Sequence, residues 1–388
     1  MRPSAIKFVV LLGIVSLFAD MTYQGARSIT GPYLALLGAS AVVVGFVAGF
    51  GELLGYSLRL VSGYLADRTG KYWSIMITGY VCNLLAVPLL ALVNHWWMAS
   101  ILIILERTGK AIRTPARDAM LSHASQRIGM GWGFGLHEAL DQTGAMAGPL
   151  LVALVLYYKD GYHYAFALLA IPALLAIIIL LFARHLYPHP QSLDIPQVHL
   201  ETKSLRDNKV FWIYLIGAGL VAAGFADFPL IAYHFEKTKV VSMVWVPIAY
   251  ALAMGVDGVA APLLGRLYDK YGFIVLIVVT VISCLFAPFV FLGNFSWAIA
   301  GVILWSIGMG AHESLMRAVV ANMVPANKRA SAYGVFNMGF GLFWFLGSVL
   351  MGVLYDISIP WLVAFSLLIQ LSAIPILALV INKKESGT

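Results

Sequence analysis

Long apolar segments recur along the chain and leave little choice of fold. Mostly hydrophobic windows of about 20 residues occur twelve times. About 20 apolar residues are what a helix needs to cross a bilayer, and helices satisfy all their backbone polar groups internally. The composition agrees: 61% of the residues are hydrophobic and 11% are charged, whereas about a quarter are charged in a soluble domain. The sequence therefore predicts an all-α membrane protein.

The expected transmembrane helices are joined by short turns, except at one place. Residues 185–207 hold several prolines and charges, as a linker does. We therefore expect an N-terminal six-helix half at 1–184 and a C-terminal six-helix half at 208–388. The first apolar run lacks a small-residue cleavage site and is expected to be a helix, not a signal peptide. The predicted spans are 7–36, 41–67, 73–93, 96–124, 130–157, 161–184, 208–235, 241–267, 273–292, 296–323, 329–355 and 359–381.

Lysine and arginine are distributed unevenly over the predicted loops, and this bias sets orientation. With the N-terminus inside, the outer loops carry only Lys159, Lys237 and Lys239. Both termini and the linker are therefore expected in the cytoplasm, with the chain in a bacterial inner membrane. The same bias explains the net charge of +7, so no nucleic-acid partner is expected.

The two halves repeat short sequences in the same order, which indicates duplication. Gly63-x-x-x-Asp67 near the end of the second span is answered by Gly265-x-x-x-Asp269 in the eighth. The sequence Phe-Ala-Asp ends at Asp20 in the first span and again at Asp227 in the seventh. Duplicated halves of this kind are typical of secondary transporters, whose site lies at mid-membrane between the repeats.

The second span ends in a motif that resembles one found in a known transporter family. Gly63, Asp67, Arg68, Gly70 and Lys71 form Gly-x-x-x-Asp-Arg-x-Gly-Lys, similar to the first cytoplasmic hairpin of the major facilitator superfamily. With twelve spans and a central linker, the resemblance covers the whole chain. It implies the major facilitator fold and transport by alternating access, in a subgroup similar to bacterial drug/proton antiporters.

Two further motifs extend the resemblance. Gly144-x-x-x-Gly148-Pro149 looks like the fifth-helix motif of the family's antiporters, although it continues as Leu-Leu-Val without the trailing glycines. Arg107 in the fourth span looks like the arginine of the family's fourth-helix motif, with a shorter spacing to the next glycine. The run from Arg107 to Asp118 is similar to a subgroup of bacterial permeases.

The fourth span holds an unusual number of charges. Arg107, Lys110, Arg113 and Arg117 follow at steps of three, three and four residues, so they lie along one side of a helix. Charged groups within a membrane normally face a protein interior or a water-filled cavity. We therefore expect this side to point toward other helices.

Other intramembrane charges and several motif positions complete the candidate set. At mid-membrane, a carboxylate exposed alternately to the two sides can load and release a proton; Asp20 is our first choice for this role and Glu52 our second. Candidates for substrate or proton binding are Asp20, Arg27, Glu52, Arg59, Arg107, Lys110, Asp141, Asp227, Asp257 and Glu313. Candidates for gating and conformational roles are Gly63, Asp67, Arg68, Gly70, Lys71, Arg113, Arg117, Asp118, Glu138, Gly144, Gly148, Pro149, Gly265, Asp269 and Arg317.

Counting residues from the turn between the fourth and fifth spans predicts which charges meet. Glu138 should lie at the height of Arg117, and Asp141 at that of Arg113, so we expect ion pairs there. Glu313 and Arg317 are four residues apart and can pair on one helix face. The alternative role for all these groups is a static salt bridge that holds helices together.

The sequence thus predicts a secondary transporter, in first place a proton-coupled antiporter that exports a small organic compound. No nucleotide-binding segment, cofactor site or enzymatic motif is recognised. His137-Glu138-x-x-Asp141 lacks the second histidine of zinc-binding helices, so no metal site is expected there. The alternatives are uptake or facilitated diffusion of an anionic solute, metal-ion export using Asp20, Asp227 and His234, and a non-transporting membrane sensor. The expected partners are substrate, protons and the bilayer, with the chain a monomer.

Overall fold

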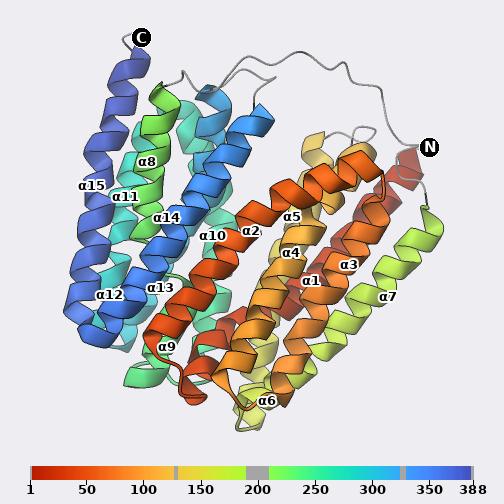
Figure 1. Ribbon diagram of the computed structural model, residues 1–388, viewed down its shortest axis with the longest axis horizontal. Coiled ribbons are helices and arrows are strands. Elements are labelled where there is room, and N and C mark those ends of the chain that lie inside the picture. Colours follow the sequence, from red (N-terminus) through yellow and green to blue (C-terminus); the bar gives the residue numbers. More distant parts are fainter. Residues whose placement is uncertain (1, 126–129, 189–208, 324–328, 386–388) are drawn as a thin grey trace. The chain divides into compact units, whose positions relative to one another are not determined.

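The computed structural model describes residues 2–125, 130–188, 209–323 and 329–385, which form helices joined by short turns, with no strand among them (Figure 1). The all-α prediction is confirmed. The helices are α1 (Arg2–Leu36), α2 (Ala41–Thr69), α3 (Tyr72–Leu89) with the 3-10 turn η1 (Leu90–Leu92), α4 (Trp96–Ser125), α5 (Met130–Tyr158), α6 (Tyr162–Leu168), α7 (Ala170–Leu186), α8 (Lys209–Ala223), α9 (Phe228–Thr238), α10 (Trp245–Tyr271), α11 (Ile274–Cys284), α12 (Phe286–Leu292), α13 (Phe295–Met323), α14 (Arg329–Ile357) and α15 (Ile359–Glu385).

The predicted spans correspond to these helices. Eleven segments of the described chain are long and apolar enough to cross a membrane. The twelfth long element is α4, which is not among them because it holds the charged run. Three predicted spans are each built from two consecutive helices: α6 with α7, α8 with α9, and α11 with α12. Most of the predicted linker, from residue 189, lies outside the described residues.

The chain divides into two compact units. Unit 1 comprises Met1–Leu37, Leu54–Val198 and Met243–Ala251, and unit 2 comprises Gly38–Leu53, His199–Ser242 and Leu252–Thr388. The first part of α2 therefore belongs to unit 2, and the first part of α10 belongs to unit 1.

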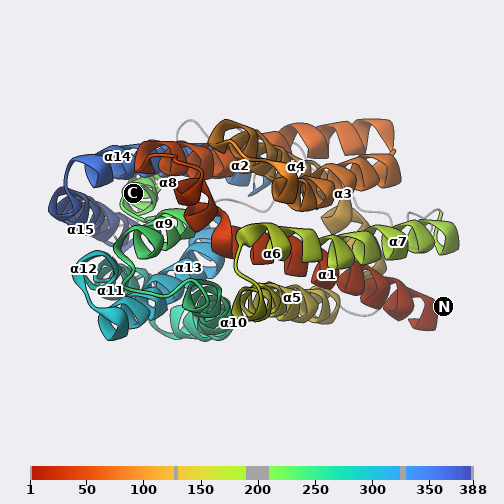
Figure 2. The ribbon, with the colours of Figure 1, turned by 90° about the horizontal axis from the view of Figure 1, so that it is seen from below.

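In unit 1, α1 packs mainly against α5, and α3 packs mainly against α4; α3 and α4 lie side by side in Figure 2. Glycines allow both contacts. A methyl group at Gly148 would meet the backbone of Met21, with 2.8 Å to its Cα, and one at Gly144 would meet the backbone of Leu17. Small residues at four-residue spacing are a common way for membrane helices to approach closely. Gly109 likewise faces the backbone of Asn83 on α3.

Unit 2 repeats these pairings. Its first span packs through α8 against α14 and α15, just as α1 packs against α5 and α7 in unit 1. Likewise, α13 packs against α11 and α12, just as α4 packs against α3. Gly347 of α14 lies against the backbone of Ala223. Gly70 and Gly272, which follow the two repeated motifs, both have positive φ, 65° and 68°. Each donates its N–H to a carbonyl four residues back, as in a left-handed helix cap.

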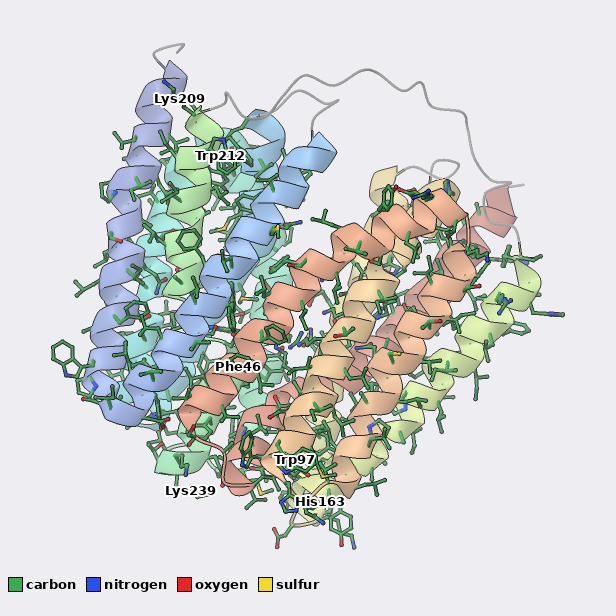
Figure 3. The ribbon with its side chains drawn as sticks, in the orientation of Figure 1. Phe46, Trp97, His163, Lys209, Trp212 and Lys239 are labelled. Atoms are coloured by element: carbon green, nitrogen blue, oxygen red, sulfur yellow. The ribbon has the colours of Figure 1, made fainter. Side chains whose placement is uncertain are left out.

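The span made of α8 and α9 is interrupted in the middle. Figure 3 places Lys209 and Lys239 at opposite ends of unit 2, so the two helices together cross it. Residues 224–227 between them are not helical, and Pro229 in the first turn of α9 suits a helix start. The Gly224 carbonyl, which has no helical partner at this break, accepts hydrogen bonds from the side chains of Ser366 and Gln370 at 2.6 and 2.9 Å.

The start of α2 is held by α14 within unit 2. The carboxylate of Asp356 accepts the N–H groups of Ala41 and Val42, each at 3.2 Å. These are among the first N–H groups of the helix, which have no carbonyl partner of their own. Gly45 and Gly352 let the two backbones approach. Asp356 therefore acts as a capping group supplied from another helix.

Candidate functional site

Three side chains of α1 meet three cations of α4 in a regular antiparallel arrangement. We call this set the charge ladder. From one end to the other, its rungs are Tyr23 with Lys110, Asp20 with Arg113, and Ser16 with Arg117. Steps of three and four residues on both helices bring each set onto one face. The prediction that the basic side of α4 points toward other helices is thus confirmed.

Asp20 stands at the centre of the ladder. Its Oδ2 accepts a 2.8 Å hydrogen bond from the Tyr23 hydroxyl, and its Oδ1 lies 3.9 Å from Nη2 of Arg113. The Tyr23 hydroxyl in turn accepts a 2.8 Å hydrogen bond from Nζ of Lys110, which lies 4.0 Å from the centre of the Tyr23 ring. Tyr23 therefore connects a buried carboxylate to a lysine of the neighbouring helix. A change of charge at Asp20 therefore acts directly on the hydrogen bonds of Tyr23.

Arg113 is fully buried. Its guanidinium carbon lies 4.3 Å from the ring centre of Tyr80 on α3, a cation–π distance that helps a desolvated arginine. Its Nε and Nη1 have no hydrogen-bond partner in the described structure. The weak, 3.9 Å contact with Asp20 is its ion pair.

Arg117 gathers the charges at the next rung. Its Nε and Nη2 both lie 2.9 Å from Oδ1 of Asp118, and its Nη1 lies 3.5 Å from Oδ2 of Asp141 on α5. His137 Nδ1 lies 3.6 Å from the same Asp141 oxygen, and its Nε2 is 2.9 Å from the Ser16 hydroxyl. The rung therefore ties α1, α4 and α5 together.

The expected pairing of α4 with α5 is wrong in register. Glu138 is exposed and accepts a 3.3 Å hydrogen bond from Gln142 of its own helix, and no ion pair with Arg117 is formed. Asp141 takes that place, and Arg113 pairs with Asp20. The reason is that α5 packs mainly on α1 through its glycines, which turns the face carrying Asp141 toward α4. Counting heights along two helices gives no information on this rotation.

Arg107 and Glu106 form a separate pair near the start of the charged run. Their side chains lie 3.4 Å apart, and both residues are buried. Asn83 of α3 donates to the Glu106 side chain at 2.7 Å and to its carbonyl at 3.0 Å. Glu106 was not among the predicted site residues, although it neutralises Arg107.

Arg59 reaches the same region from α2. Pro115 of α4 has no N–H, so the carbonyl of Ala111 four residues earlier loses its helical partner. The Ser62 hydroxyl donates to that carbonyl at 3.1 Å. A Cβ built at Gly63 would lie 3.4 Å from Cβ of Pro115, so α2 also faces α4 here. Arg59 lies about one helical turn before Ser62, and its charge acts on Lys110. Its Nε is buried without a hydrogen bond.

The candidates of unit 2 form their own groups. Asp227 is buried at the break before α9, where its Oδ2 accepts hydrogen bonds from Trp344 and Ser348, both at 2.9 Å. Asp257 of α10 is buried against Gly310 of α13. Glu52 lies in the part of α2 that belongs to unit 2.

Several candidates make local contacts or lie outside the described side chains. Asp67 accepts a 2.9 Å hydrogen bond from Tyr72 in the first turn of α3, and Arg68 donates to Tyr64 at 3.2 Å. Lys71 and Asp269 lie at helix ends near these turns, and Arg27 is half-buried in α1. A Cβ built at Gly265 would have no atom of the described structure within 4 Å, so no close helix contact is seen at this glycine. The side chains of Glu313 and Arg317 are outside the described set, so their expected pair stays a prediction.

Apart from Glu106, the residues that sequence reasoning missed are uncharged. Ser16, Tyr80 and Asn83 hold the ladder and the Glu106 pair. A signal existed for Ser16, which lies four residues before Asp20 on the same helix face. Among the described residues, no group of three or more His, Cys, Asp or Glu could hold a metal ion.

Comparison with known proteins identifies the family. The sequence model of the Major Facilitator Superfamily matches residues 12–347 and, in a second match, residues 245–388. The chain belongs to the major facilitator superfamily. The resemblance seen at Gly63–Lys71 is confirmed, and the chain is a multi-pass membrane transporter of this type.

Relatives and solved structures agree with this membership. An uncharacterized protein of Mycobacterium tuberculosis is 43% identical over 380 residues, covering 96% of this chain and 93% of the relative. An uncharacterized transporter of this superfamily from Methanocaldococcus jannaschii is 28% identical over 91% of this chain and 89% of its own. The multidrug resistance protein MdtH of Proteus mirabilis is 29% identical over 32% of this chain and 31% of its own. The crystal structure of the nucleoside transporter NupG has a TM-score of 0.73 at 16% identity, covering 97% and 98% of the two chains.

Proposed function

We propose that this transporter of the major facilitator superfamily couples the movement of a small organic compound to the movement of protons. The observation that carries the proposal is the Asp20–Tyr23–Lys110 connection. A buried carboxylate at mid-membrane is a functional candidate by default, and this one is linked by hydrogen bonds to a lysine that is half-buried. Transport requires no cofactor and no chemical step on the substrate.

The coupling works through charge at Asp20. The groups that face this carboxylate are Tyr23 of its own helix, Lys110 and Arg113 of α4, and Asp141 of α5. When Asp20 is ionised, it holds the Tyr23 hydroxyl and attracts both cations. A proton on Asp20 removes that attraction, so Lys110 gains freedom to leave Tyr23. Protonation and the position of Lys110 are therefore linked.

Export by proton antiport is the first candidate for the direction. It is supported by the local similarity to MdtH, which is named a multidrug resistance protein, and by the fifth-helix glycines that pack on α1. In this proposal the two sequence halves, 1–184 and 208–388, rock around the site. The monomeric chain lies in a bacterial inner membrane with both termini in the cytoplasm.

Uptake of an anionic solute together with protons is the second candidate. The observation that favours it is that Arg59 and Lys110 form no ion pair with a carboxylate in the described structure. Protonating Asp20 leaves these cations with still less negative charge beside them. A proton and an anion would then favour each other's binding.

The test uses proteoliposomes that contain a pH-sensitive dye. A pH gradient is imposed, and ethidium and benzoate are added in turn as a cationic and an anionic probe. A probe that is carried changes the rate of proton movement: antiport and symport give opposite signs for a probe added on the same side. The matched variants are Asp20→Asn, which removes the titrating group, and Asp160→Asn, in an exposed turn.

We expect Asp20→Asn to abolish probe-dependent proton movement while the protein still elutes as a folded monomer, and Asp160→Asn to leave it unchanged. Tyr23→Phe keeps the ring beside Lys110 but removes the connecting hydroxyl, so it should slow coupled movement without stopping it. Proton coupling that persists in Asp20→Asn rules out this carboxylate as the coupling group.

A further inference from the structure

Positive charge exceeds negative charge around Lys110. The charges of Arg59, Arg107 and Arg113 all act on Lys110, and Asp20 is the carboxylate that attracts it. Glu106 neutralises Arg107, and Asp20 is shared between Arg113 and Lys110. Four cations thus share these two carboxylates with Asp141, which also acts on Lys110 and Arg113 although its ion pair is with Arg117. Like charges held close together away from water are costly unless a counter-charge is present.

Lys110 and Arg59 keep unused donors. Lys110 donates one hydrogen bond, to Tyr23, although an ammonium group has three N–H donors. Nε of Arg59 is buried without a partner, and its guanidinium lies 5.7 Å from the ring centre of Tyr56. Neither residue forms an ion pair with a carboxylate in the described part of the chain. Both are half-buried, so they are not enclosed as Arg113 is.

A hydrogen bond between α2 and α4 sets the relative height of these two cations. The carbonyl of Ala111, freed by Pro115, binds Ser62 of α2 and sets the two helices at one register. Because α2 and α4 contact there, Arg59 one turn before Ser62 and Lys110 one residue before Ala111 lie at similar depth. Arg107 is not a third cation of this kind, because it already forms an ion pair with Glu106. Asn83 holds Glu106 in place by a hydrogen bond.

We propose that Arg59 and Lys110 form a subsite for an anionic oxygen group, a carboxylate or a phosphate, of a small organic substrate. This inference deepens the proposed function by naming the substrate's chemical class. Arginine offers a planar fork of donors and lysine a mobile point charge, and both bind such groups. The aromatic rings of Tyr23 and Tyr56 lie beside the two cations and offer apolar contact to the less polar part of an organic anion.

Binding is tested apart from transport. The protein is placed in nanodiscs of zwitterionic phosphatidylcholine, and its thermal unfolding is followed at constant ionic strength. Four probes of similar size are compared: benzoate, phenylphosphonate, benzyl alcohol and benzylammonium. A ligand that binds the folded protein raises the unfolding midpoint by mass action. We expect benzoate, phenylphosphonate or both to raise it, and the neutral and cationic probes to have no such effect.

Variants assign the effect to the subsite. Arg59→Gln and Lys110→Gln should each weaken anion binding about tenfold or more, since a hydrogen bond to a charged group is lost. Lys110→Arg keeps the charge and should retain binding, which separates loss of the site from loss of the fold. Lys159→Gln, an exposed surface cation, is the matched control and should bind as the unaltered protein does.

Three results would overturn the subsite: no midpoint shift with either anion, an equal shift with benzylammonium, or an anion shift that survives in both Gln variants. Nanodiscs containing phosphatidylglycerol separate a lipid headgroup from a soluble anion. If only the anionic lipid raises the midpoint through Arg59 and Lys110, the substrate assignment is wrong. Proton coupling is measured in a different assay, so it can fail while this subsite stands, and the reverse also holds.

Discussion

Arg117 of α4 forms its cross-helix ion pair with Asp141 of α5, at 3.5 Å. This pair lies one helical turn beyond Glu138, which stays exposed. The same Asp141 oxygen lies 3.6 Å from His137, and Arg117 also donates to Ser16 of α1. The pair is therefore the point at which α1, α4 and α5 share one polar network.

Breaking this pair should be costly. Asp141→Asn removes one of the negative charges beside the guanidinium of Arg117. Removing one partner of a buried ion pair typically lowers the free energy of unfolding by about 3–5 kcal/mol. Because Asp118 still contacts Arg117, we expect the loss of stability to lie toward the lower end of this range. The free energy of unfolding in detergent measures it. Glu138→Gln is the control on the same helix and should cost little.

A charge exchange tests the pair more strictly. In the double variant Arg117→Asp with Asp141→Arg, the two charges face each other again. A double-mutant cycle should then show favourable coupling of about 1 kcal/mol or more between the two sites. Additive losses would contradict a direct pair. The same exchange between Arg117 and Glu138 should give no coupling.

The close approach of α1 and α5 predicts opposite effects for two glycines of one helix. Gly148→Ala would drive a methyl group into the backbone of Met21, and overpacking of this kind costs about 1–3 kcal/mol. At Gly135 no atom of the described structure lies within 4 Å of the new methyl, so Gly135→Ala should stabilise α5 by up to about 1 kcal/mol. Thermal unfolding of both variants measures the contrast. Equal effects would show that the packing is looser than described.

Removing the cap supplied by Asp356 should loosen the first turn of α2. Asp356→Ala leaves the N–H groups of Ala41 and Val42 without their acceptor, which typically costs about 1 kcal/mol. Hydrogen exchange of the amides at the start of α2 should become faster, while exchange in α14 away from the site stays slow. Asp356→Asn keeps an acceptor oxygen and should show a smaller change.

The proposed subsite predicts how pH changes anion binding. A proton on Asp20 removes the negative charge that attracts Lys110 and Arg113, so benzoate should bind more tightly in acidic than in alkaline buffer. In Asp20→Asn this dependence should disappear, and binding should stay at its acidic level. Titrations of benzoate at several pH values provide the measurement. Binding that weakens on acidification would reverse the sign of the linkage.

The spans and the duplication could be predicted because they depend on sequence patterns alone. Apolar length gives the helices, and the repeated Gly-x-x-x-Asp segments give matching turns, where Gly70 and Gly272 adopt the same left-handed conformation. The interruption of the seventh span also leaves a signal in the sequence. Gly224 and Pro229 lie on either side of Asp227, and both residues favour a helix end or start.

The pairing of charges could not be predicted in the same way. It depends on which helices are neighbours and on how each is rotated, and the glycine contacts of α5 with α1 decide both. The three rungs of the charge ladder follow once α1 and α4 are known to be antiparallel neighbours. The role of Ser62 needed two facts together, a carbonyl freed by proline and a hydroxyl on another helix.

The break between α8 and α9 has a consequence for how this part of unit 2 can move. A helix interruption is often treated as a hinge. Here, however, the backbone carbonyls that lack a helical partner accept hydrogen bonds from side chains of other helices. Trp305 of α13 donates to the Ala226 carbonyl at 2.8 Å, and Ser366 and Gln370 of α15 hold that of Gly224. Bending at the break would strand these polar groups in an apolar interior. We therefore infer that α8, α9, α13 and α15 travel as one rigid block during transport.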